Sequence, residues 1–133
     1  MNNKIEPHYV NFEQAKWLKE KGFNLYCSCS YWKKDFTRHT PGYALENGET
    51  SQENYYDFPR YYAPEQWQVI EWLRVNHGIW AEVRRTQFFG ETRFQAYVND
   101  TPLTGELGGF VSQEQPKEAY SAAFNYIREN NLI

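Results

Sequence analysis

The sequence has no excess of basic residues and no long hydrophobic run. Its 133 residues include 14 Lys and Arg against 17 Asp and Glu, which gives a net charge of −3. Binding to a nucleic-acid backbone needs a clear basic excess, so we expect no nucleic-acid partner. No stretch approaches the roughly 18 apolar residues of a membrane span, and the first ten residues lack the apolar segment of a signal peptide. We therefore expect a soluble, cytoplasmic protein that does not bind membranes.

Cysteine is scarce: the chain has two, Cys27 and Cys29. Two residues apart on a strand, their side chains point to the same face, and a disulfide between them would be strained. A metal site would need two further ligands, and none of the three histidines stands at ligand spacing. We expect reduced thiols that pack as small hydrophobic groups, with no metal and no cofactor.

Recognisable catalytic motifs are also missing. No G-x-S-x-G nucleophile elbow occurs, and the glutamates at 46, 49 and 53 show no spacing typical of paired acid–base catalysts. The glycine-rich stretch LTGELGGF at 103–110 lacks the lysine and the spacing of a phosphate-binding loop. The sequence therefore predicts a protein that is not an enzyme.

Helix-capping residues predict three helices. Asn11 with Gln14 has the pattern of a capping box, and Pro64 and Pro116 suit first helical turns. Gly22 and Gly78 are expected to end the first two helices with positive φ, and Asn131 to end the third. The first two predicted helices lie between Asn11 and Gly22 and between Pro64 and Gly78. The third ends at Asn131 and begins either after a cap formed by Ser112 with Gln115 or at Pro116.

Alternating side chains predict strands between these helices. They occupy residues 24–32, 79–88 and 92–99, with a weaker strand near 109–111. The middle two should pair as a hairpin around a turn at Phe89-Gly90-Glu91. The expected fold is α+β: a single domain, 1–133, with three helices packed on a small antiparallel sheet, in the order α-β-long loop-α-β-β-β-α. Residues 33–62 form an aromatic-rich excursion that holds a short hairpin at most, with Asn47-Gly48 as a candidate turn.

The densest aromatic run of a chain that is 19% aromatic is YYDFPRYYAPEQW at 55–67. Tyrosine, tryptophan and arginine are favoured at binding hot spots. The predicted binding residues are therefore Trp32, Tyr55, Tyr56, Phe58, Arg60, Tyr61 and Tyr62. Three interpretations stay open: a cluster that holds the long loop onto the second helix, a protein interface, or a surface that stacks on sugar rings.

Three segments carry a resemblance to a known group of proteins: VNFEQAKWLKEKGF, YYAPEQWQVIEWLRVNHGI and EAYSAAFNYIRENNLI. The chain resembles a family of small uncharacterised proteins of bacterial prophages and mobile elements. The matching positions are Leu18, Gly22, Phe23, Pro64, Trp72, Leu73, Arg74, Glu118, Ala119, Asn131, Leu132 and Ile133. The resemblance implies a genomic setting and a fold, but no activity, substrate or catalytic residue.

Together these observations favour a non-enzymatic accessory or protein-interaction protein of a prophage or mobile element, whose partner is another protein or a second copy of itself. The alternative is a ligand-binding module that uses the aromatic loop, with a glycan as one candidate ligand. Exposed aromatic residues on a flat surface would favour an interface, and aromatic residues around a pocket would favour a ligand.

Overall fold

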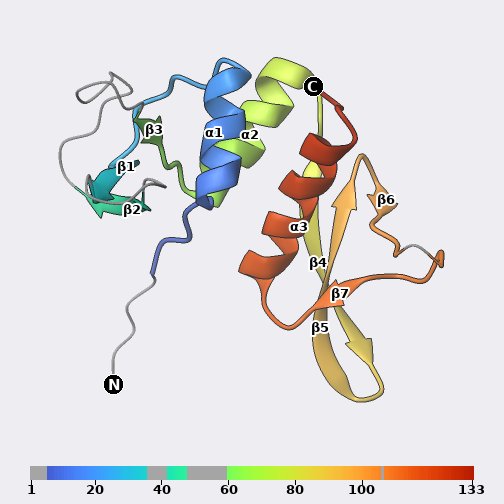
Figure 1. Ribbon diagram of the computed structural model, residues 1–133. Coiled ribbons are helices and arrows are strands. Elements are labelled where there is room, and N and C mark those ends of the chain that lie inside the picture. The colour runs from blue at the N-terminus through green and yellow to red at the C-terminus, as the bar shows by residue number, and fades with distance from the viewer. Residues whose placement is uncertain (1–5, 36–41, 48–59, 106) are drawn as a thin grey trace. The chain divides into compact units, whose positions relative to one another are not determined.

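The computed structural model describes residues 6–35, 42–47, 60–105 and 107–133, without the side chains of 32–35, 42, 46 and 47 (Figure 1). It divides into two compact units, Met1–Glu65 and Gln66–Ile133, called here the N-terminal and the C-terminal unit. Within these described residues, no helix has the length and apolarity needed to cross a membrane. Each unit combines helix with antiparallel sheet, so each can be described by itself.

The N-terminal unit opens with helix α1, Phe12–Glu20, which begins at a complete capping box. The Gln14 amide donates to Asn11 Oδ1 at 2.8 Å, and the Asn11 amide donates to Gln14 Oε1 at 3.1 Å. These two bonds satisfy amides that a helix start otherwise leaves open. Val10 and Ala15, on either side of the box, are both buried, as expected for a hydrophobic staple.

The sheet of this unit has three antiparallel strands with β1, Cys29–Asp35, in the middle. β2, Gly42–Asn47, pairs along β1 from Cys29 to Asp35, and β3, Tyr61–Tyr62, pairs with Ser30 and Tyr31 on the other edge. β3 also contacts α1. The sheet therefore brings residue 61 next to the first helix.

The C-terminal unit places helix α3, Pro116–Glu129, along the hairpin of β4, Ala81–Phe88, and β5, Glu91–Val98 (Figure 1). Helix α2, Gln66–His77, precedes the hairpin and contacts β4 and α3. The buried Gln66 Nε2 donates to the carbonyl oxygen of Lys117 at 2.9 Å and so ties the starts of the two helices together.

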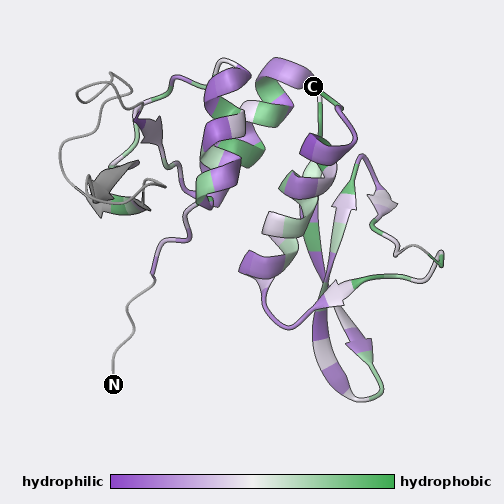
Figure 2. Cartoon of the chain, viewed as in Figure 1, coloured by the Kyte–Doolittle hydropathy of each residue, from purple (hydrophilic) through white to green (hydrophobic). Residues whose placement is uncertain are grey.

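The turn between β4 and β5 fixes their register. Phe89 and Gly90 form a two-residue connection with φ of 49° and 80°, as type I′ hairpin turns require. The pairing that follows runs without interruption from Phe88–Glu91 to Ala81–Val98. Figure 2 shows the resulting alternation of hydrophobic and hydrophilic residues along both strands.

Alternation separates the hairpin into two chemically different faces. Ala81, Ala96 and Val98 share one face and are buried, and the apolar side chains of α3 that are also buried include Phe124 and Ile127. Since α3 contacts both strands, it covers this face. The other face carries Arg84, Gln95, Tyr97 and their neighbours, and no helix is needed to bury such side chains.

The remaining edge of β5 is shared by two short strands. β6, Thr101–Pro102, pairs with Tyr97 and Val98, and β7, Ser112–Gln113, pairs with Phe94 and Gln95. Between them the chain leaves the edge and returns, held by the bridge between Thr104 and Phe110 and by the Val111 amide, which donates to the Leu103 carbonyl at 3.2 Å. This excursion places Phe110 and Val111 beside the sheet.

The helix ends use two capping patterns. At the end of α1 the Phe23 amide donates to the Leu18 carbonyl and Gly22 has φ of 90°, which is a Schellman motif. Asn131, with φ of 52°, ends α3 in the same way. At the end of α2 the Gly78 amide instead donates to the Arg74 carbonyl, the bond of the simpler left-handed cap.

The α+β class and the three predicted helices are confirmed in the described residues, as is the central hairpin. The prediction of one small sheet was wrong, because each unit has its own antiparallel sheet. The predicted strand at 24–32 was too long, since β1 begins at Cys29 and residues 24–28 are not in a strand. Residues 33–62 contain β2 and β3, which is more structure than the short hairpin expected there. Asn47 ends β2, paired with Cys29, while Gly48 lies outside the described residues. The assignment of 1–133 to one domain stays a prediction.

Replacing Gly22 or Gly78 by alanine should lower the free energy of unfolding by about 1 kcal/mol each. Both glycines have positive φ, and a Cβ would meet no atom within 4 Å at either position, so the cost is backbone strain alone. Gly109→Ala is the matched control, because Gly109 is equally open but has no positive φ. Urea denaturation measures all three, and equal losses at Gly109 and Gly22 would contradict the strain argument.

Candidate functional site

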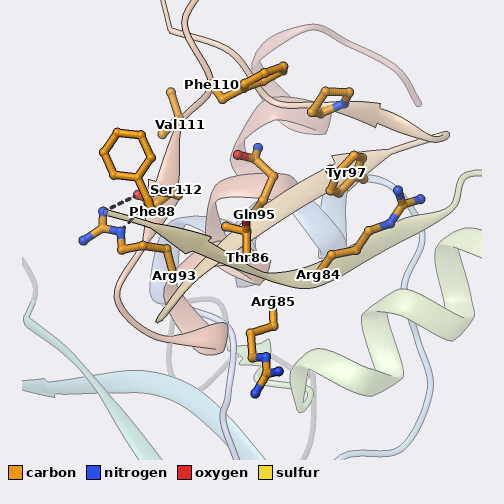
Figure 3. A pocket seen from close by; sticks show the side chains of 11 residues that line it. Arg84, Arg85, Thr86, Phe88, Arg93, Gln95, Tyr97, Phe110, Val111 and Ser112 are labelled. Atoms are coloured by element: carbon orange, nitrogen blue, oxygen red, sulfur yellow. Dashed lines mark hydrogen bonds between the residues drawn. The ribbon is translucent and has the colours of Figure 1, made fainter. Parts of the chain in front are cut away.

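The uncovered face of the C-terminal sheet carries a cavity of about 650 Å³. Its floor is made by side chains that the hairpin register brings opposite one another. Arg84 pairs with Gln95, Thr86 with Arg93, and Tyr97 follows two residues after Gln95 on the same face. Arg85 is the neighbour of Arg84 in the chain, but Figure 3 shows its side chain leaving in the opposite direction.

Apolar side chains form the rim of the cavity. Phe88 comes from the end of β4, and Phe110 and Val111 come from the excursion between β6 and β7 (Figure 3). All three are exposed, with 59% of Phe88 and 76% of Phe110 accessible. Exposed aromatic groups around a hollow are the usual sign of a binding surface, because a monomer rarely gathers them without a partner.

Gln95 is the most buried polar group of the floor, with 5% of its surface exposed. Its Nε2 donates to the carbonyl oxygens of Ala96 and Leu103, each at 3.1 Å. Both partners are acceptors, so only the NH₂ end of the amide can face them. The acceptor Oε1 is thereby left on the cavity side, toward Phe88 and Val111 (Figure 3).

The two arginines of the cavity differ in how far their charge is neutralised. The Arg84 guanidinium lies 3.9 Å from the centroid of the Tyr97 ring. It donates hydrogen bonds to the carboxylate of Glu82 and, at 3.4 Å, to that of Asp100. Glu82 therefore already balances much of this guanidinium's charge, and Asp100, which is 90% exposed, adds a weaker contribution.

Arg93 is held mainly by neutral groups. Its Nε donates to Ser112 Oγ at 3.1 Å and its Nη2 to the Ser112 carbonyl at 2.7 Å (Figure 3). Among the described residues it forms an ion pair with Glu114 at 3.8 Å, and the Glu114 side chain is 82% exposed, where solvent weakens ion pairs. Arg93 is three-quarters buried and keeps most of its positive charge available to an occupant.

The chemistry of this lining is that of recognition. Among the described residues that line the cavity are arginines, aromatic rings and amide or hydroxyl groups, but no carboxylate, histidine, cysteine or lysine. These groups donate and accept hydrogen bonds, pair with carboxylates and offer aromatic faces, which are the interactions of a binding site.

Three of the predicted binding residues are described with their side chains. Arg60, Tyr61 and Tyr62 lie in the N-terminal unit, where all three are half-buried, and they are not among the residues that line the cavity. Trp32 is in β1 with its side chain undescribed, and Tyr55, Tyr56 and Phe58 are outside the described residues.

Tyr61 belongs to an aromatic cluster formed with Phe12, Tyr31 and Tyr43. Its ring centroid lies 5.6 Å from that of Phe12 and 5.8 Å from that of Tyr43, and Lys19 Nζ sits 5.1 Å above it. Lys19 also donates to the Arg60 carbonyl at 2.9 Å. Burial raises the pKa of the Tyr61 phenol. These contacts favour the first interpretation of the aromatic run, a cluster that pins the chain, but on the first helix and not on the second.

Cys27 and Cys29 are free and buried. Burial raises the pKa of the Cys27 thiol to about 12, and its Sγ donates to the Leu25 carbonyl at 3.3 Å. In the part of the chain that the structure describes, no group of three or more His, Cys, Asp or Glu side chains could hold a metal ion.

The cavity was not predicted because its residues carry no motif. Arg84, Arg93, Gln95 and Tyr97 lie on two strands, and their meeting depends on the register of the pair. The available signal was weak: polar and basic side chains at every second position of a strand whose other face is apolar. The isolated Phe110, in a glycine-rich stretch, was interpreted only as part of a connection.

Comparison with known proteins gives no relative: no protein family, curated protein or solved structure matches this chain significantly. The resemblance to proteins of prophages and mobile elements therefore stays a prediction. Any functional assignment has to come from the geometry of the chain itself.

Tyr61→Ala should lower the free energy of unfolding by roughly 1–3 kcal/mol, because it removes two ring contacts and the surface under Lys19. Phe89→Ala should change it by less than about 0.5 kcal/mol, since 93% of Phe89 is exposed. Chemical denaturation compares the two variants. A neutral Tyr61→Ala would remove the structural interpretation of this residue.

Cys27 should resist alkylation by iodoacetamide at pH 8 in the folded protein and react readily in denaturant. With a pKa near 12, the thiol is almost wholly protonated at that pH, and only the thiolate reacts. Mass spectrometry after proteolysis measures the labelling.

A chelator should leave the melting temperature of the protein unchanged. A fall of several degrees would show that a metal ion supports the fold.

Proposed function

We propose that this protein is a non-enzymatic interaction protein that binds an apolar, acid-bearing segment of a partner protein in the cavity of its C-terminal unit. An accessory role in a prophage or mobile element, which the sequence resemblance implies, belongs to the same proposal. The observation that carries it is the cavity lining, which joins an exposed aromatic rim to arginines.

The apolar part of the proposal rests on Phe88, Phe110 and Val111. A partner that covers these exposed side chains would be stabilised on them, because apolar surface contributes about 25 cal/mol for each Å² removed from water. Aromatic side chains and arginine are also the residues most enriched in interface hot spots. A partner would therefore insert a large apolar side chain between these rim residues.

The acidic part rests on charge complementarity. From residue 64 onward the chain has six basic residues against nine acidic ones, yet the lining of the cavity includes Arg84 and Arg93 and no acidic residue among those described. Among the described lining residues the cavity therefore gathers basic side chains without acidic ones, although this part of the chain is net acidic. Complementary charge favours an acidic partner and disfavours a basic one.

A second candidate function is the binding of a small ligand such as a glycan. A volume of about 650 Å³ falls within the roughly 300–1,000 Å³ of small-molecule sites. Sugar rings also stack on aromatic faces, and the exposed ring of Phe110 offers one at the cavity. Binding on a carbohydrate array that disappears in Phe110→Ala, together with the absence of peptide binding, would favour this candidate over the first.

The first candidate is tested by selecting from a random library of 12-residue peptides displayed on phage, with the immobilised full chain as bait. The enriched peptides should combine Asp or Glu with an aromatic or large aliphatic residue. The best peptide, made synthetically, should bind Phe110→Ala at least about tenfold more weakly than the unmodified chain, as expected for a hot-spot side chain.

Phe89→Ala is the matched control for this experiment. Phe89 is also an exposed phenylalanine next to the cavity, but it is not among the residues that line it. Its replacement should leave the affinity within about twofold. Equal losses in Phe89→Ala and Phe110→Ala, or a selection without an acidic and apolar consensus, would contradict the proposed function.

A further inference from the structure

Gln95 and Arg93 are two polar groups of the cavity floor whose hydrogen-bonding capacity the fold leaves partly unused. They lie two residues apart on the same face of β5. Gln95 spends both hydrogens of its Nε2 on backbone carbonyls, and within the described residues its Oε1 accepts no hydrogen bond. Arg93 donates hydrogen bonds from Nε and Nη2 to Ser112 and forms an ion pair at 3.8 Å with the exposed carboxylate of Glu114.

Filling the cavity changes the surroundings of Gln95 Oε1. A ligand that covers this oxygen removes its water, and unless the ligand supplies a donor the oxygen is left buried without a hydrogen bond. The oxygen cannot turn away, because the bonds to Ala96 and Leu103 hold the amide in place. Gln95 therefore favours an occupant that presents an N–H or O–H group at this point.

Arg93 makes a different demand on the same occupant. Its guanidinium is fixed by Ser112 at the side of the cavity near Phe88 (Figure 3). A fixed and largely buried cation forms strong, charge-assisted bonds with carboxylates. Arg84 is less suited to this, since Glu82 already balances much of its charge.

We infer that Gln95 and Arg93 determine which peptides the cavity accepts: Gln95 Oε1 accepts a backbone N–H of an extended segment, and Arg93 pairs with a carboxylate of that same segment. The spacing suits this arrangement, because residues two apart on β5 are about 7 Å from each other and an extended peptide repeats at the same interval. A segment lying along β5 can thus meet both groups at once. This inference rests on the proposed function and adds the specificity of the site to it.

The test uses the synthetic peptide from the selection described above as its probe. Each backbone N–H is replaced in turn by N–CH₃, and each Asp or Glu by Asn or Gln, and affinities are measured by isothermal titration calorimetry. One N-methylated position and one amidated position should each weaken binding to the unmodified protein about tenfold or more.

Protein variants assign these losses to the two residues. Against Gln95→Met, the sensitive N-methyl peptide should bind no worse than the parent peptide, because the acceptor is already gone. Against Arg93→Gln, the amidated peptide should likewise lose nothing further. Arg74→Gln is the matched control for charge, since Arg74 lies on α2 outside the cavity, and there the full loss on amidation should persist.

The outcomes separate this inference from the proposed function. If binding still requires Phe110 but tolerates N-methylation and amidation at every position, the specificity assigned to Gln95 and Arg93 is wrong and the proposed function stands. If binding does not require Phe110 either, both fail. Should Gln95→Met not fold, the peptide modifications and Arg93→Gln alone decide.

Discussion

The register of the β4–β5 hairpin is the constraint on which the C-terminal unit depends. Because side chains alternate along a strand, a slip of one residue would send Ala96 and Val98 to the open face and Gln95 and Tyr97 under α3. The turn at Phe89-Gly90 fixes the register from one end, and the burial of apolar side chains against α3 fixes it along its length. The cavity is the other consequence of the same register.

The two faces of this hairpin illustrate how a small fold separates stability from recognition. The face under α3 is closed by alanine and valine, which allow helix and sheet to approach closely. The open face carries side chains with polar ends, and the excursion between β6 and β7 raises Phe110 and Val111 beside them. The exposed rim residues Phe88, Phe110 and Val111 can therefore change with little effect on the core, a division that is common where loops and edges carry function.

Much of the local structure could be predicted from the sequence. Capping residues such as Asn11, Gly22 and Asn131 act through bonds within a few residues, so their effect can be read locally. The hairpin of β4 and β5 was equally readable, because its turn and its alternation lie in one continuous stretch. The strand predicted at 24–32 was correct only in part: its alternation continues through 24–28, but among the described residues β1 and its pairing begin at Cys29.

The sequence by itself determined the helix ends, the α+β class and a net-acidic composition, since these follow from local backbone preferences and from residue counts. Only the tertiary structure decided which aromatic residues pack and which face outward. Tyr61, in the most conspicuous aromatic run, packs against Phe12 and Tyr43, whereas the isolated Phe110 is exposed beside a cavity. The physical reason is that burial depends on what a distant part of the chain places opposite a side chain, and no local pattern records that partner.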